Sequence, residues 1–157
     1  MNELKILSAT SLFENISENE IQKILPCLKA TKHHFRKGEY IYRLGDKIKS
    51  IGVVLSGSVD IIKYDLWGNT HIIERMNTGG SFAEAYACQK NIASLVDVVA
   101  SEESQILLIN TDKILQKCTS CCPFHRVLIE NLLQIIAQKN LNLIKKIELL
   151  TPKSLRQ

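Results

Sequence analysis

The sequence predicts a mainly β domain, a roll of the jelly-roll type, flanked by helices and followed by one long helix. Three observations lead to this prediction. Short apolar segments alternate with glycine turns through the middle of the chain, a capping motif precedes an apolar helical stripe near the start, and an apolar heptad pattern runs through the last third. The 157 residues suit one domain with an extension.

The composition indicates an ordinary folded domain, with 45% hydrophobic and 23% charged residues. No segment reaches the roughly 18 uninterrupted apolar residues of a membrane span, and the start lacks a signal-peptide pattern. We therefore expect a cytoplasmic protein without a membrane partner. The 5 cysteines are odd in number and scattered, which favours reduced thiols. A net charge of +4 is too small to indicate a nucleic-acid surface by itself.

The first predicted element is a helix over residues 18–28, within an N-terminal helical segment at 1–30. Ser17 and Glu20 have the spacing of a capping box, in which each side chain pairs with the other residue's backbone amide. The apolar residues that follow repeat at helical spacing and would give one buried face: Ile21, Ile24, Leu25 and Leu28.

Residues 31–112 are predicted to form the roll. Apolar residues alternate in segments 51–55 and 59–61, and glycines at 45, 57, 68 and 79–80 separate the strands. The segment DLWGN at 65–69 predicts a hairpin turn between two such strands. Residues 106–109 would be the last strand.

Residues 113–150 are predicted to contain a linker helix and a long helix from about residue 124. A stripe in this helix has alternating spacings of four and three residues, which is the seam of a coiled coil, with one polar position. We therefore expect a homodimer through this seam, with Asn140 fixing its register. The seam is formed by Ile129, Leu133, Ile136, Asn140, Leu143, Ile147 and Leu150.

A second stripe beside the seam is expected to pack on the roll, formed by Leu128, Leu132, Ile135 and Ile144. A single amphipathic helix covering its own core is the alternative, but it accounts for only one of the two stripes. After the long helix, TPKSLRQ at 151–157 contains a proline that suits the first turn of a new helix. We expect that this chain is part of a longer protein.

The order of these elements resembles the regulatory half of the CRP/FNR transcription regulators of bacteria. The resemblance rests on FRKGEYIYRLGD (35–46), IGVVLSGSVDII (51–62), GGSFAEAYAC (79–88) and VVASEESQILLI (98–109). It implies a cyclic-nucleotide-binding-type roll, joined through a dimerisation helix to a winged helix-turn-helix domain that begins at 151–157 and is otherwise missing here. The chain would then be an effector-sensing and dimerisation domain, with no enzymatic activity, and DNA would be bound only through the missing domain.

The family's nucleotide cassette runs approximately Gly-x-x-Phe-Gly-Glu and, after a short helix, Arg with a small polar neighbour. The resemblance matches Gly79, Phe82 and Glu84 to the first glycine, the aromatic residue and the acid. Ala83 replaces the second glycine, and its side chain is expected to prevent easy access to positive φ. Ser94 falls at the arginine position.

Leu95 falls at the position of the arginine's small polar neighbour, and the interval 76–125 contains no arginine. A hydrogen bond to a charged group contributes about 1.5 to 3 kcal/mol, so its loss weakens a cyclic nucleotide by roughly tenfold to a hundredfold. We therefore predict a small-molecule effector other than cAMP and no further cofactor. Its candidate pocket is formed by Gly79, Phe82, Ala83, Glu84, Tyr86, Ser94, Leu95 and Asn140.

Three alternatives remain open from the residues alone. The domain could bind a cyclic nucleotide, or it could be a dimerisation module without a ligand. The CxxCC cluster Cys118, Cys121 and Cys122 has a spacing that can hold a metal or a redox disulfide, although incidental thiols are commoner.

A further hypothesis is that the protein is an enzyme, in which the roll holds a metal as in cupins. Its candidate ligands are His33, His34, Glu39 and His71. His33 and His34 are adjacent, and adjacent strand residues point to opposite faces, so they are poorly placed to share one metal. No catalytic motif stands out elsewhere, which argues against an enzyme.

Overall fold

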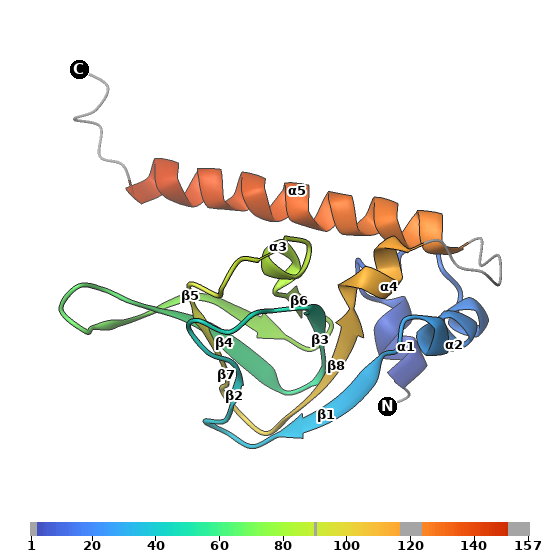
Figure 1. The fold of residues 1–157 in the computed structure, drawn as a ribbon, viewed down its shortest axis with the longest axis horizontal. Coiled ribbons are helices and arrows are strands. Elements are labelled where there is room, and N and C mark those ends of the chain that lie inside the picture. Colours follow the sequence, from blue (N-terminus) through green and yellow to red (C-terminus); the bar gives the residue numbers. More distant parts are fainter. Residues whose placement is uncertain (1–2, 90, 117–123, 151–157) are drawn as a thin grey trace.

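The computed structural model describes residues 3–89, 91–116 and 124–150, with residue 150 described by its backbone only. It confirms the predicted mainly β class with a long C-terminal helix (Figure 1). The elements are α1 (Glu3–Ser8), α2 (Glu18–Cys27), β1 (Thr31–Phe35), β2 (Tyr40–Tyr42), β3 (Ser50–Ser56), β4 (Ser58–Tyr64), β5 (Thr70–Asn77), β6 (Ser81–Phe82), α3 (Glu84–Ala87), β7 (Asp97–Ala100), β8 (Ser104–Asn110), α4 (Thr111–Leu115) and α5 (Phe124–Leu150).

The roll consists of two four-stranded sheets with antiparallel pairing throughout. Their strand orders are β1-β8-β3-β6 and β2-β7-β4-β5. The predicted turn at 65–69 joins β4 and β5, and the Asp65 carboxylate accepts hydrogen bonds from the amides of Trp67 and Asn69. This hairpin projects away from the rest of the roll (Figure 1). Its tip carries Leu66 and Trp67, which are 97% and 83% exposed.

Strand β3 contributes to two separate cores, which explains the unbroken apolar run from 53 to 55 within it. Ile51, Val53 and Leu55 pack with the helices α1, α2 and α5 in one cluster. Val54 points to the interior of the roll, where it meets Val59 of β4. Both faces of the strand are therefore buried, since helices cover the side that would otherwise be exposed to water.

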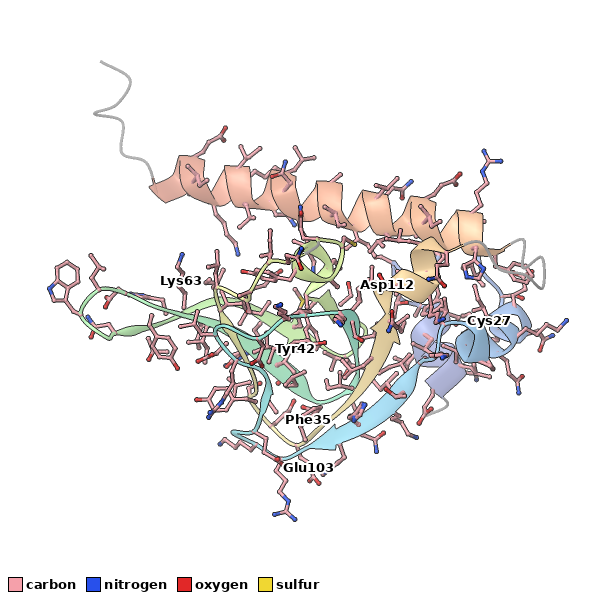
Figure 2. The ribbon with its side chains drawn as sticks, in the orientation of Figure 1. Cys27, Phe35, Tyr42, Lys63, Glu103 and Asp112 are labelled. Atoms are coloured by element: carbon pink, nitrogen blue, oxygen red, sulfur yellow. The ribbon has the colours of Figure 1, made fainter. Side chains whose placement is uncertain are left out.

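The interior of the roll is filled by side chains, several of them aromatic (Figure 2). Tyr42 lies near the middle of the view, and its hydroxyl donates to the backbone carbonyl of Ser50 at 2.9 Å. Burial raises the pKa of Tyr42 to about 12. Gly52 of β3 faces Phe82 of β6, and a Cβ atom at Gly52 would overlap the Phe82 ring, so the close approach of these strands requires glycine.

Helix α2 begins at the predicted capping box. The Ser17 hydroxyl accepts from the amide of Glu20 at 3.3 Å, and the Glu20 carboxylate accepts from the amide of Ser17 at 3.2 Å. The predicted apolar face is buried, since Ile21 and Ile24 are fully covered by the helical core. The local sequence signal therefore predicted this element correctly.

Helix α5 lies along the roll and passes over α3 and α4 (Figure 1). Leu128, Leu132 and Ile135 are buried against the helical core, as the second stripe predicted. The prediction is wrong for Ile144, which is 45% exposed. The reason is geometric, because beyond Ile136 the helix no longer packs on a continuous core.

Candidate functional site

A cavity of about 670 Å³ lies between the second sheet, α3 and the middle of α5. Pockets that bind small molecules commonly fall in the range of about 300 to 1,000 Å³. The residues that line it are Ile48, Ile61, Ile73, Glu74, Ala83, Glu84, Ala85, Tyr86, Val96, Val98, Leu133, Ile136, Ala137, Lys139, Asn140, Asn142, Leu143 and Lys146.

The floor of the cavity is apolar because three strands of the second sheet present branched side chains to it. Ile61 comes from β4, Ile73 from β5 and Val98 from β7. Strand β4 pairs with both β5 and β7, and Ile61 lies opposite Val98 in the β4–β7 pair. The three strands therefore form one continuous surface. A phosphate group placed on this floor would lose its hydration without gaining donors there, which is costly.

The charged centre of the cavity is an ion pair between α3 and α5. Lys139 Nζ lies 2.6 Å from Glu84 Oε2 and donates to the backbone carbonyl of Ser81 at 2.5 Å. The Glu84 side chain is 2% exposed, whereas that of Lys139 is 29% exposed. Glu84 Oε1 is buried and has no hydrogen-bond partner. The acid of the cassette is therefore neutralised by a lysine of the chain's own long helix.

The backbone of the cassette keeps the shape that a glycine would give it. Ala83 has φ 69° and ψ 13°, in the left-handed region, and directly precedes α3. The expectation that its side chain would prevent a positive φ is wrong. The left-handed conformation costs an L-residue roughly 1 to 2 kcal/mol, and the neighbouring buried residues Phe82 and Glu84 hold the chain in it.

The structure brings together four of the residues predicted for the pocket. Ala83, Glu84, Tyr86 and Asn140 all line the cavity, the last from α5 and the others from the cassette. Their individual roles in binding remain predictions.

Four other predicted residues lie outside the lining. Phe82 is fully buried in the interior of the roll. The Ser94 hydroxyl is also buried, where it donates to the Val96 carbonyl at 2.6 Å. Leu95 is 62% exposed at the surface. The fourth, Gly79, belongs to a separate hollow.

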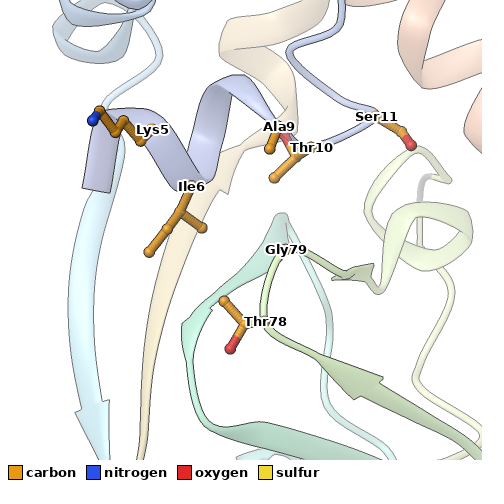
Figure 3. Close-up of a pocket in the computed structure, with 7 residues that line it drawn as sticks. All are labelled: Lys5, Ile6, Ala9, Thr10, Ser11, Thr78 and Gly79. Carbon is orange, nitrogen blue, oxygen red and sulfur yellow. The ribbon is translucent and has the colours of Figure 1, made fainter. Parts of the chain in front are cut away.

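Gly79 borders a smaller hollow of about 380 Å³ between α1 and the turn before β6 (Figure 3). Its amide donates to the Val54 carbonyl at 2.8 Å, so this group is already used within the roll. Thr10 and Lys5 of the N-terminal segment lie across from it. Gly79 adopts a positive φ of 88° in this turn, which glycine reaches without steric cost because it has no Cβ atom.

Several residues of the predicted dimer seam also border the cavity. Leu133, Ile136 and Leu143 line it together with Asn140. Leu133 and Leu143 are nevertheless 63% and 49% exposed, and Ile147 is 61% exposed. Ile129 is half-buried, and the side chain of Leu150 lies outside the described residues. The seam itself stays a prediction.

Lys139 and Lys146 line the cavity but are not among the residues predicted for the pocket. A signal for them does exist, because the buried stripe of α5 continues at the same spacing with polar residues. After Leu128, Leu132 and Ile135 come Lys139, Asn142 and Lys146. Polar residues in a core-facing stripe indicate a polar or hollow partner surface. Lys146 Nζ donates to the Ile73 carbonyl at 3.2 Å.

Cys88 and the histidine candidates do not line this cavity. Burial, together with the nearby Glu84 carboxylate, raises the pKa of the Cys88 thiol, which makes it less reactive at neutral pH. Cys118, Cys121 and Cys122 lie outside the described residues. His34 contacts Glu103 and His71 contacts Asp65, and no group of three potential metal ligands occurs within 3–89, 91–116 and 124–150.

The antiparallel roll, with its cavity beneath a long helix, has the architecture of regulatory domains of the cyclic nucleotide-binding type. The model of the cyclic nucleotide-binding domain family matches residues 32–121, and the chain belongs to this family. Among curated proteins, none matches the sequence significantly. Among its described helices, none has the length and apolarity that a membrane crossing requires.

Solved structures with the same fold include bacterial transcription regulators. The catabolite activator protein of Thermus thermophilus has a TM-score of 0.74 at 20% identity, covering 90% of this chain and 63% of its own. DNR of Pseudomonas aeruginosa, a transcriptional regulator, has a TM-score of 0.65 at 25% identity, covering 93% and 62%. A cyclic nucleotide-binding domain of Methylobacillus flagellatus has a TM-score of 0.79 at 17% identity, covering 95% and 82%. The chain thus spans less than two thirds of the first two proteins.

Proposed function

We propose that this chain is the effector-sensing and dimerisation domain of a cytoplasmic CRP/FNR-type transcription regulator that responds to a small molecule other than cAMP. It has no enzymatic activity in this proposal, and DNA is bound through a further domain. The observation that supports it is the cavity beneath α5. Its floor is apolar, its acid Glu84 is paired with Lys139, and none of its described lining residues is an arginine that could bind a phosphate.

The charges around the cavity argue against a cyclic nucleotide. No arginine lines it among the described residues, and the more accessible of its two lysines is 146, whose ammonium contacts a backbone carbonyl. Lys139 is already paired with Glu84. A cyclic phosphate would therefore bind without the bidentate fork that arginine supplies, and the charge of Lys139 is already offset by Glu84.

A thermal-shift titration tests the ligand part of the proposal. A ligand that binds only the folded state raises its stability in proportion to the logarithm of its concentration above Kd. We expect no shift with cAMP or cGMP at micromolar concentration, and a shift with uncharged apolar compounds. Stabilisation by micromolar cAMP would refute the choice of ligand and favour the nucleotide alternative.

The dimer part rests on the exposed apolar seam of α5. Ile147 lies on the seam outside the cavity, and Leu149 lies off the seam on the same turn. We expect Ile147→Glu to convert a dimer to a monomer in size-exclusion chromatography with light scattering, since it places a charge in an apolar interface. Leu149→Glu is the matched control and leaves the dimer intact. A dimer that survives Ile147→Glu would show that the interface lies elsewhere.

A further inference from the structure

The Lys139 ammonium has hydrogen-bonding capacity that the folded chain does not use. An ammonium group carries three N–H donors. Two are directed to Glu84 Oε2 at 2.6 Å and to the Ser81 carbonyl at 2.5 Å. Within the described part of the chain no partner is present for the third. Because Lys139 lines the cavity and its side chain is 29% exposed, this third donor is accessible to a ligand.

The charges of the lining balance one another. Glu84 and Lys139 form a neutral pair, and the other ionisable side chains with opposite charges are Glu74 of β5 and Lys146 of α5. The remaining surface is apolar apart from Asn140, Asn142 and the hydroxyl of Tyr86. A ligand that carries a net charge would therefore leave the cavity with an unbalanced charge in an apolar surrounding, which is costly.

Each sign of charge meets a specific obstacle at Lys139. A carboxylate that accepts the third N–H would lie beside the Glu84 carboxylate, whose Oε1 already lacks a donor. A ligand ammonium would be repelled by the Lys139 ammonium. It would also be kept from the Glu84 carboxylate, because the Glu84 side chain is only 2% exposed. A neutral oxygen acceptor satisfies the donor and meets neither obstacle.

We propose that the cavity binds an uncharged, largely apolar molecule whose carbonyl or ether oxygen accepts a hydrogen bond from Lys139, so that this lysine determines ligand specificity. The inference rests on the proposed function of the cavity as an effector site. Lys139 belongs to α5 and its partners Ser81 and Glu84 belong to the cassette. A ligand on this donor therefore contacts the roll and the long helix at once.

A set of four phenylalkanes of nearly equal size tests the choice of charge. Benzylacetone carries a carbonyl, hydrocinnamate a carboxylate, phenylpropylamine an ammonium, and propylbenzene no polar group. Isothermal titration of the full chain at neutral pH gives the four affinities. We expect benzylacetone to bind about tenfold tighter than propylbenzene, and also tighter than both charged compounds. Tightest binding by either charged compound would overturn the proposal.

A paired substitution tests whether Lys139 is the donor. Lys139→Met alone leaves Glu84 buried without a partner, so it is combined with Glu84→Leu, because apolar replacement of a buried pair is often neutral for stability. In this double variant we expect benzylacetone and propylbenzene to bind with about equal affinity, while the affinity of propylbenzene stays as before. An advantage that persists would overturn the proposal.

Lys145→Met is the matched control, since Lys145 is an exposed lysine of α5 that does not line the cavity. It leaves all four affinities unchanged. Failure of all four compounds to bind overturns the inference. If cAMP or guanosine then stabilises the chain, sensing by this cavity survives with a different ligand chemistry; if neither does, its sensing role is refuted as well.

Discussion

The two halves of α5 are held to the molecule in different ways. In the first half, to residue 136, Leu128 and Leu132 are buried in the helical core. Asn131 donates to the carbonyls of Leu12 and Glu14 at 2.9 and 2.8 Å, which fixes the helix to the segment between α1 and α2. This half is part of the core in the ordinary sense, with apolar packing and satisfied polar groups.

In the second half, from Ala137 to Leu149, every residue except Lys139 is exposed. Two lysines of this half make polar contacts with the roll, Lys139 with the cassette and Lys146 with the Ile73 carbonyl. One helix thus contains an anchored part and a part whose position depends on a few polar contacts over a cavity. A change in what fills the cavity would therefore act on the second half first.

The largest effect is expected from truncating the anchored half. Leu128→Ala removes a fully buried side chain and lowers the free energy of unfolding by about 2 to 5 kcal/mol. Leu141→Ala, in the second half, changes it by less than about 0.5 kcal/mol because Leu141 is 52% exposed. Urea denaturation at one fixed protein concentration measures both. Equal losses would show that the two halves are packed alike.

The next largest effect concerns the ion pair. Lys139→Met leaves Glu84 buried and unpaired, and we expect a loss of about 3 kcal/mol in the free energy of unfolding. Lys139→Arg keeps the positive charge and recovers most of it. Thermal and urea unfolding of the three proteins provide the measurement. An unchanged stability in Lys139→Met would mean that the second half is not held through this pair.

A smaller loss is expected when the polar anchor of the first half is removed. Asn131→Ala leaves the carbonyls of Leu12 and Glu14 without their donor, at a cost of about 1 to 3 kcal/mol. Asn142 is the control, because its side-chain oxygen accepts a hydrogen bond from Gln138 at the surface. The same denaturation experiment on Asn142→Ala should give a loss within about 0.5 kcal/mol; similar losses for both would contradict the comparison.

The smallest effect on global stability is expected from Lys146→Met. This exposed lysine contributes one hydrogen bond to a backbone carbonyl, so the free energy of unfolding changes by less than about 0.5 kcal/mol. Hydrogen exchange at the backbone amides of α5 is the sharper measurement. The amides of residues 141–149 exchange faster in the variant, while those of residues 128–136 do not. Uniform acceleration along the helix would show that α5 opens as one unit.

Features with local causes could be predicted from the sequence. The capping box at Ser17 and Glu20, the turn after Asp65 and the extent of α5 depend on residues within a few positions of each other. The family and fold followed from the order of such features. The Glu84–Lys139 pair could not be predicted in this way, because it depends on where α5 crosses the roll.

Ala83 shows a second limit of local rules. Its residue type disfavours positive φ, yet the buried side chains on either side determine its conformation. Likewise, Gly79 and Ser94 match positions of the cassette in sequence but lie outside the cavity. The Gly79 amide and the Ser94 hydroxyl already donate hydrogen bonds within the roll, which motif spacing does not reveal.

The hairpin tip between β4 and β5 gives the protein a spectroscopic property. Trp67 is the single tryptophan of the chain and its side chain is among the most exposed in the molecule. Its fluorescence therefore reports on the solvent around the hairpin and changes little when the distant core unfolds. A blue shift of its emission during association would place the hairpin tip at a newly formed contact, which makes this residue a built-in optical probe of assembly.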